Sequence, residues 1–273
     1  MYKIFLTVRN RLALTCKCIT ALTKHSILPH QLYVYDNLTS TKIQEHFMYW
    51  SLLYEKGLVD QITFTTKGST FNAFSKAVTC NMFGQQHNMD PDKNKYDFLV
   101  FLDNDIIVTP GWDRVITEAW RDVRKANLLN IKIIGQYPGG IKNKENINFK
   151  IANKTAYSGK FGGSGFWCIK PDFFDTVGFL DLRFLVGQNK KHDQHYWSLL
   201  EKSSNGKPYI LGIDERLAIH VGGKFSQSIC NILTKTNGDE SKIEDTDDKR
   251  IDDMSFDEFY NLIINDKELL TNW

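Results

Sequence analysis

The sequence predicts an α/β fold in which one doubly wound sheet is flanked by helices, and three observations carry this prediction. Segments with the composition of strands alternate with segments of helical periodicity over most of the chain. At 273 residues, 42% of them hydrophobic, the chain can bury one large core. Several predicted strands end in polar residues just before a helix, as in doubly wound sheets whose ligands bind beyond the carboxyl ends of the strands.

Composition argues against several other classes of protein. With 34 basic and 32 acidic side chains the formal net charge is +2, so the overall charge favours neither nucleic acid nor an anionic membrane as a partner. Five cysteines without a Cys-x-x-Cys pair argue against a disulfide framework or a zinc site. The chain shows neither a signal-peptide pattern nor an apolar stretch long enough to span a membrane. We therefore expect a cytoplasmic protein with no integral membrane segment.

The first two predicted strands, at residues 3–8 and 31–35, each lead into polar residues and then a helix. If both belong to one doubly wound sheet, those polar residues meet at the edge where such folds bind nucleotides. The candidates for a nucleotide pocket are Thr7, Arg9, Asn10 and Asp36. The alternatives are that Asp36 only caps the next helix and that Arg9 is an ordinary surface charge.

The stretch over residues 98–108 sets two carboxylates inside an otherwise apolar segment. Residues 98–102 have the aromatic and aliphatic content of a strand that is covered on both faces. Asp103 and Asp105 are two residues apart, so they point to the same side if the strand continues. Such close like charges repel unless a cation lies between them, and Mg²⁺ or Mn²⁺ binds carboxylate oxygens. The alternative is a solvated turn at the end of the strand.

The second half of the chain adds further segments of the same kinds. A helix is predicted over 112–125, a strand over 131–135 and a lysine-bearing loop or hairpin over 137–160. A glycine-rich turn precedes a strand that starts at Phe166, and Asp193 falls in the first turn of a later helix. A further strand delivers His220 to its end, where a lone histidine is usually structural.

Taken in order, these motifs resemble the GT-A fold glycosyltransferases, most closely the family 2 type that uses nucleotide-diphosphate sugars. The resemblance covers about residues 3–224. It rests on Thr-x-Arg-Asn after the first strand, the Asp-Asn ending of the second, Asp103-Asn104-Asp105, the glycine-rich turn, and His-Val-Gly-Gly at residues 220–223. It implies a GT-A mixed sheet in one catalytic domain, residues 1–225. An acidic linker and a C-terminal helical extension, residues 226–273, would follow.

The resemblance also implies roles for individual residues. The residues expected to contact the nucleotide-sugar donor, most simply a UDP-sugar, are Thr7, Arg9, Asn10, Asp36, Asp103 and Asn104. The residues expected to hold Mn²⁺ or Mg²⁺ are Asp105, His220 and Asp103. The catalytic base of an inverting transfer would be Asp193. The acceptor region would contain Gly163, Ser164, Trp167, His192 and His195. His192 and His195 stand where the family carries acidic residues, a departure that bears on the acceptor contacts.

The acceptor stays open at this point: a saccharide, a lipid-linked glycan, a protein or a hydroxylated base in DNA. The lysines of residues 137–160 and 190–191 would suit a phosphate backbone, although the small net charge argues against nucleic acid. A sugar-phosphate nucleotidyltransferase should carry a glycine-rich loop directly after the first strand, and residues 8–12 contain no glycine. The alternative of another class is a non-catalytic sugar- or nucleotide-binding module. The joint presence of Asp103, Asp105, Asp193 and His220 favours an enzyme.

Overall fold

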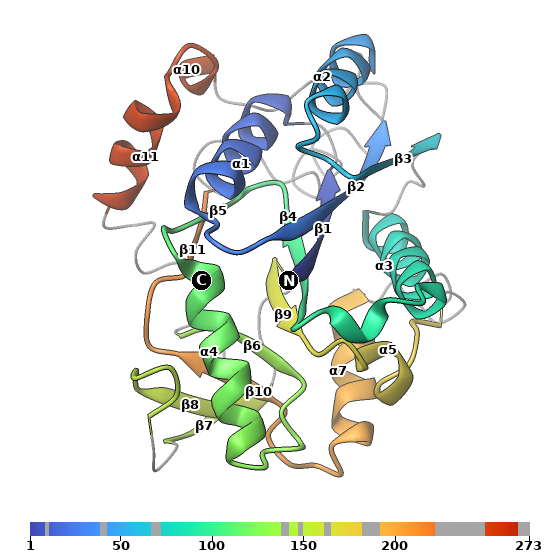
Figure 1. Cartoon of the computed structure of the whole chain (residues 1–273), viewed down its shortest axis with the longest axis vertical. Helices are drawn as coiled ribbons and strands as arrows, with labels where there is room; N and C mark the ends of the chain where they lie inside the picture. Colours follow the sequence, from blue (N-terminus) through green and yellow to red (C-terminus); the bar gives the residue numbers. More distant parts are fainter. Residues whose placement is uncertain are drawn as a thin grey trace, which may run out of the picture.

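The structure is a computed structural model, and it describes residues 1–8, 11–38, 43–66, 72–137, 142–146, 150–160, 165–181, 192–221 and 249–266. Helices cover both faces of a central sheet (Figure 1). None of the helices in these ranges is long and apolar enough to cross a membrane.

One mixed sheet of nine strands forms the centre of the described chain. Its strands are β1 (Tyr2–Val8), β2 (His30–Leu38), β3 (Gln61–Thr66), β4 (Leu99–Asp103), β6 (Ile133–Gln136), β7 (Lys142–Asn146), β8 (Ala156–Lys160), β9 (Phe166–Ile169) and β10 (Ile210–Ile213). They lie in the order β3-β2-β1-β4-β9-β6-β10-β8-β7. The pairs β1–β2, β1–β4, β2–β3 and β6–β10 are parallel, and the other pairs are antiparallel. The predicted α/β fold with a mixed sheet is thus confirmed.

Two layers of helices bury the two faces of this sheet. The helices are α1 (Leu12–His25), α2 (Ile43–Glu55), α3 (Asn72–Met89), α4 (Trp112–Lys125), α5 (Phe173–Thr176), α7 (His192–Ser203), α10 (Lys249–Asp252) and α11 (Phe256–Ile264), with a 3-10 turn, η1 (Lys93–Lys95). Alternate side chains of β1 enter opposite cores, because successive residues of a strand point to opposite faces. Ile4 and Leu6 pack beneath α1, α2 and α4, whereas Phe5 packs beneath α3, α5 and α7.

The apolar segment that carries the two predicted metal ligands is not one continuous strand. β4 ends at Asp103, and a turn through Asn104 and Asp105 separates it from β5 (Ile106–Val108). β5 leaves the main sheet and pairs with β11 (Ala218–His220) in a separate two-stranded sheet. The condition for Asp103 and Asp105 to point to the same side, a strand that continues through both, is therefore wrong. The alternative, a turn at the end of the strand, is therefore present, although Asn104 and Asp105 are buried in it rather than solvated.

The described part of the C-terminal extension packs against α1. Phe259 and Ile263 of α11 are fully buried in the core that α1 and α4 share. The ring of Tyr260 lies edge-on to that of His25, with 4.7 Å between the ring centroids. The expected C-terminal helical extension contains α11, which ends at Ile264, and residues 267–273 lie outside the described residues.

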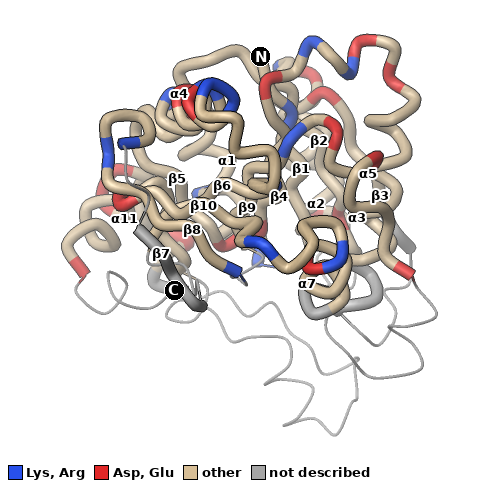
Figure 2. Tube along the Cα trace, turned by 90° about the horizontal axis from the view of Figure 1, so that it is seen from below, with Lys and Arg blue, Asp and Glu red and all other residues tan. Residues whose placement is uncertain are grey.

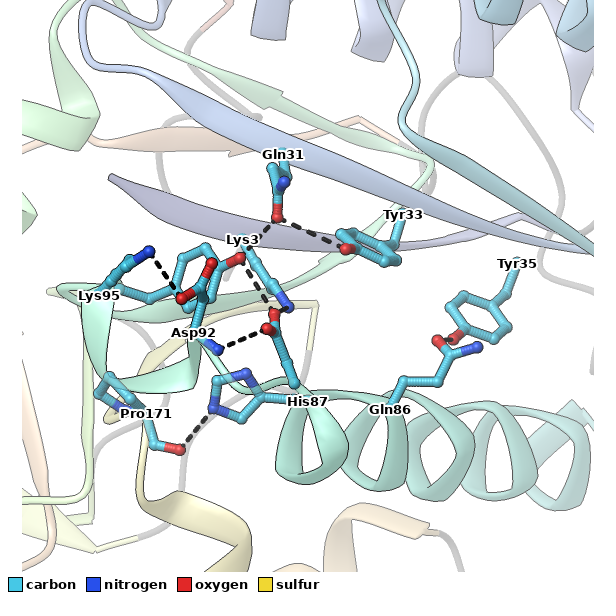
Figure 3. A network of polar contacts seen from close by, with 11 residues as sticks. Lys3, Gln31, Tyr33, Tyr35, Gln86, His87, Asp92, Lys95 and Pro171 are labelled. Atoms are coloured by element: carbon cyan, nitrogen blue, oxygen red, sulfur yellow. Dashed lines mark hydrogen bonds and ion pairs between the residues drawn. The ribbon is translucent and has the colours of Figure 1, made fainter.

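Lys3 of β1 is buried at the end of the sheet where this strand begins (Figure 3). The side chain of Lys3 is only 3% exposed and forms an ion pair with Asp90. Asp90 also accepts hydrogen bonds from the Tyr96 hydroxyl at 3.1 Å and the Asp92 backbone at 2.8 Å. Burial opposes ionisation of Asp90, but Lys3 and the other donors outweigh it and hold the pKa of this carboxyl below its usual value. The network lies at the end of the sheet where β1 begins. The candidate site lies at the other end, where β1 and β4 end.

Candidate functional site

The carboxyl ends of β1 and β4 bring Thr7 and Asp103 together. The two strands are parallel, and their register sets Thr7 beside Asp103. The Thr7 hydroxyl donates a 2.7 Å hydrogen bond to Asp103 Oδ1, and the backbone N–H of Asp103 donates to the Gly165 carbonyl at 3.0 Å. The polar residues predicted to meet at this end of the sheet were those after the first two strands, whereas the partner of Thr7 here comes from β4.

Asp105 is the hub of the site. Its carboxylate oxygen Oδ2 lies 2.5 Å from Arg11 Nη1 and 3.2 Å from His220 Nε2. The antiparallel pairing of β5 with β11 delivers the histidine, and the Val221 N–H donates to the Asp105 carbonyl at 3.0 Å. Three segments that are far apart in the sequence therefore meet at Asp105, a residue that is only 7% exposed.

Arg11 and His220 together determine the charge of this hub. Burial opposes ionisation of Asp105, but the hydrogen bond with His220 and the charge of Arg11 outweigh it and hold the pKa of the carboxyl well below its usual range. The same hydrogen bond outweighs burial at His220 and raises the pKa of the imidazole above its usual value. At neutral pH the site therefore combines one ionised carboxylate, one guanidinium and one imidazole that is easily protonated.

Arg11 is a residue of the site that was not predicted from the sequence. The only signal for it was its place in the short polar run between the first strand and the first helix. Arg11 adopts the left-handed backbone region, with φ 59°, immediately before α1. Its carbonyl accepts a 2.8 Å hydrogen bond from the Thr15 hydroxyl, and Thr15 in turn accepts one of 2.9 Å from the Asn104 amide. Asn104 is thus turned inward, where it fixes the start of α1 relative to the turn after β4.

Asp36 lies beside Val8 in the register of β1 and β2, but its side chain is fully buried. Its Oδ2 accepts a 2.6 Å hydrogen bond from Trp50 Nε1 and lies 2.8 Å from His46 Nδ1. Both partners belong to α2, so the described contacts of Asp36 join this helix to the end of β2.

The predicted acceptor region is described only in part. His195 is 8% exposed, and its Nδ1 accepts a 3.3 Å hydrogen bond from the Asp181 backbone. Burial lowers the pKa of His195, which favours a neutral ring. Trp167 is a core residue, 3% exposed, with its ring edge-on to Tyr196 at 5.8 Å between centroids.

Asp193 is the second residue of α7, which confirms its predicted place in the first turn of a helix. The side chains of His192 and Asp193 are not described, and four predicted site residues lie outside the described residues: Arg9, Asn10, Gly163 and Ser164.

The donor set at the hub fits part of a divalent-cation site. Within the described ranges, no group of three or more His, Cys, Asp or Glu side chains comes together as a metal site. Asp105 and His220 nevertheless supply a carboxylate oxygen and a ring nitrogen 3.2 Å apart. Two ligands that each lie about 2.1 Å from an octahedral ion are about 3 Å apart when adjacent, so this pair fits two ligand positions of one ion.

No protein-family profile matches the sequence, and no curated protein matches it. Solved structures do match. The mannosyltransferase PcManGT from Pyrobaculum calidifontis, solved with GDP-Man and Mn²⁺, matches with a TM-score of 0.50 and 8% identity, over 80% of this chain and 55% of that one. TarS 1–349 from S. aureus matches with a TM-score of 0.47 and 9% identity, over 80% and 59%.

The glycosyltransferase GlyE from Streptococcus pneumoniae matches with a TM-score of 0.42 and 11% identity, over 96% of this chain and 62% of that one. The chain therefore spans less than two thirds of the solved chains that it matches. At these identities the likeness concerns the fold alone. Of these three matches, the mannosyltransferase is the one with a TM-score of 0.50. Its match to the mixed sheet described above shows that this chain has a GT-A-like glycosyltransferase fold.

Proposed function

We propose that this protein is an inverting glycosyltransferase that moves a sugar from a nucleotide-diphosphate sugar to an acceptor hydroxyl, with a divalent cation bound at Asp105 and His220. The observation that carries the proposal is the convergence of Arg11, Asp105 and His220 at the carboxyl end of β4, in a fold of this type. Solved with GDP-Man and Mn²⁺, the mannosyltransferase of the same fold supports a donor of this chemical class.

Arg11, Asp105 and His220 together have the chemistry to bind a diphosphate with a cation. When bound, the cation would neutralise negative charge that develops on the diphosphate as the sugar departs. Arg11 stands at the start of α1, where its guanidinium and the helix N-terminus both favour an anion. Asp103, held by Thr7, would orient the ribose or the hydration shell of the cation. Because Mg²⁺ prefers oxygen ligands, the imidazole of His220 favours Mn²⁺.

Asp193 is the proposed general base. The acceptor hydroxyl must lose its proton as its oxygen attacks the anomeric carbon on the face opposite the diphosphate, and a carboxylate in the first turn of a helix is held ionised by the helix dipole. The proton passes to Asp193, and the electron pair of the broken bond passes to the diphosphate.

Calorimetric titration with UDP and GDP tests the donor site. With Mn²⁺ present, one of the two should bind, and EDTA should weaken that binding by about tenfold or more, since charge-assisted contacts are each worth roughly 1.5–3 kcal/mol. Asp105→Asn should reproduce the EDTA result in the presence of Mn²⁺. The matched control is Asp97→Asn, which removes a carboxylate just before the same strand and should leave binding unchanged. Metal-independent binding of equal strength would refute the cation site.

Hydrolysis of a sugar nucleotide in the absence of acceptor tests the base. Water then takes the place of the acceptor hydroxyl, so Asp193→Asn should slow hydrolysis by about 10²-fold or more while nucleotide binding stays intact. Unchanged hydrolysis by a folded Asp193→Asn protein would place the base at another residue.

A further inference from the structure

Two lysines face each other across neighbouring strands at the end of β9. β6 and β9 are antiparallel, with Ile133 opposite Ile169. Extending this register by one residue in each strand sets Lys132 opposite Lys170. Residues that are opposite each other in an antiparallel pair point to the same face, and like charges in such positions are destabilising. The pair therefore weakens the protein unless an anion lies between the two ammonium groups.

The face that these lysines share is covered by α4, which crosses in front of β6 (Figure 1). Ile169 packs in the core on the other face, so Lys170 points toward α4, and Lys132 lies close enough to Lys170 for their charges to interact. Lys170 Nζ lies 5.8 Å from the centroid of the Trp120 ring, which α4 contributes. Arg124 is one helical turn beyond Trp120 and brings a third cation to the same place. The Lys and Arg positions along α4 are drawn in blue in Figure 2.

The charges of this cluster are not balanced within the part of the chain that the structure describes. Neither lysine nor Arg124 has a carboxylate within ion-pair distance among the described residues, although Asp172 is close enough to act on Lys170. Burial lowers the pKa of Lys170, and the charges of Lys132 and Arg124 lower it further against the opposing effect of Asp172. Three cations thus lie close together with one carboxylate, Asp172, near enough to act on Lys170.

Lys170 lies beyond the end of β9 that is farther from Asp103. β9 runs antiparallel to β4, so that Phe166 lies opposite Leu102 whereas Ile169 lies opposite Leu99. The three residue steps from Phe166 to Ile169 span about 10 Å. Lys170 continues away from Asp103 and the hub, and a group bound here would not be the diphosphate of a donor at Asp105.

We propose that Lys132, Lys170 and Arg124 form a second anion site, which binds a phosphoryl group. Two ammonium groups on facing strands match the two charges of a phosphate dianion, and a planar guanidinium can donate two parallel hydrogen bonds to its oxygens. The half-buried position of Lys170 over an indole ring strengthens the attraction, because the site is less screened than an exposed pair. The phosphoryl group arrives either as the free ion or as part of a phosphodiester chain.

Thermal unfolding of the full chain in phosphate, against chloride at matched ionic strength, tests the site. A ligand that binds only the folded state raises the melting temperature. We expect the rise in wild type and a loss of about tenfold or more in phosphate affinity for Lys132→Met/Lys170→Met, which keeps the side-chain stems and removes both charges. Lys56→Met, at an exposed lysine just after α2, is the matched control and should respond as wild type does. A short thymidine oligonucleotide replaces phosphate in a second arm, and a stronger response there assigns the group to a phosphodiester.

Chloride alone gives the second readout. Lys170→Met should be at least as stable as wild type in low-salt chloride, because it removes one of several positive charges that repel each other. The difference in melting temperature between the two proteins should shrink as salt is added. An equal phosphate response in wild type and the double variant would place phosphate elsewhere, including at the donor site, and would overturn the proposal. The absence of a response to both phosphate and the oligonucleotide would also overturn it, as would a Lys170→Met protein that melts well below wild type in chloride.

Discussion

Replacing Asp105 with asparagine in the metal-free protein should reduce stability and shift the titration of His220. The side chains of Asp105 and Arg11 are only 10% and 11% exposed, so the substitution removes a charged partner from a largely buried guanidinium. Removing one partner of a buried pair costs about 3–5 kcal/mol, and we expect the lower value, about 3 kcal/mol, because asparagine retains an acceptor oxygen. For a chain of this length that corresponds to a fall in melting temperature of roughly 6–12 °C.

The sign of the pH dependence follows from the two pKa shifts. The contribution of Asp105, whose pKa is lowered, is present above the usual carboxyl pKa and is lost as the pH falls through the lowered value. The contribution of His220, whose pKa is raised, is full below about pH 6.5 and is lost as the pH rises through the raised value. The stability difference between wild type and Asp105→Asn should therefore be largest between about pH 4 and pH 6.5.

Urea unfolding at a series of pH values measures the stability difference between wild type and Asp105→Asn. NMR titration of His220 measures the pKa of its imidazole, which should return toward its usual value in Asp105→Asn. Asp97→Asn is the control, since its ion pair with the N-terminal amine is 40% exposed on the aspartate side and should contribute less than about 1 kcal/mol. An Asp105→Asn protein within about 1 kcal/mol of wild type, with an unchanged His220 titration, would refute the reasoning.

Three further substitutions test the packing that supports the site. Asp90→Asn leaves Lys3 buried without its anion and should cost about 3 kcal/mol at neutral pH; in wild type this stabilisation should be lost as the pH falls through the lowered Asp90 pKa, which acid unfolding measures. Gly84→Ala would place a Cβ 2.5 Å from ring carbons of Phe174, so urea unfolding should show a loss of about 1–3 kcal/mol, which a second substitution, Phe174→Leu, partly restores. Ser255→Ala removes the capping box of α11 and should cost about 1 kcal/mol; no change would mean that tertiary contacts alone hold this helix.

Local patterns in the sequence were sufficient to locate most strands and helices. The helix predicted over residues 112–125 matches α4 at both ends, because its apolar residues recur at helical spacing and Pro110 and Gly111 precede it. Strand segments were predicted to within a few residues, since short runs of aliphatic and aromatic residues bounded by polar ones are a local property. The same reasoning placed Asp193 at the start of α7 and the histidine at the end of β11.

The sequence by itself therefore determined the α/β class, the approximate bounds of the elements, and the positions of Thr7 and Asp103 close to the ends of two strands. Only the tertiary structure decided how the hub is built, because Asp105 meets Arg11 and His220 across 94 and 115 residues. It also decided that the strand breaks at Asn104 and that Lys132 and Arg124 come close to Lys170. Pairing register and helix docking bring such residues together, and these depend on packing over the whole core, whereas propensity and periodicity report only on near neighbours in the chain.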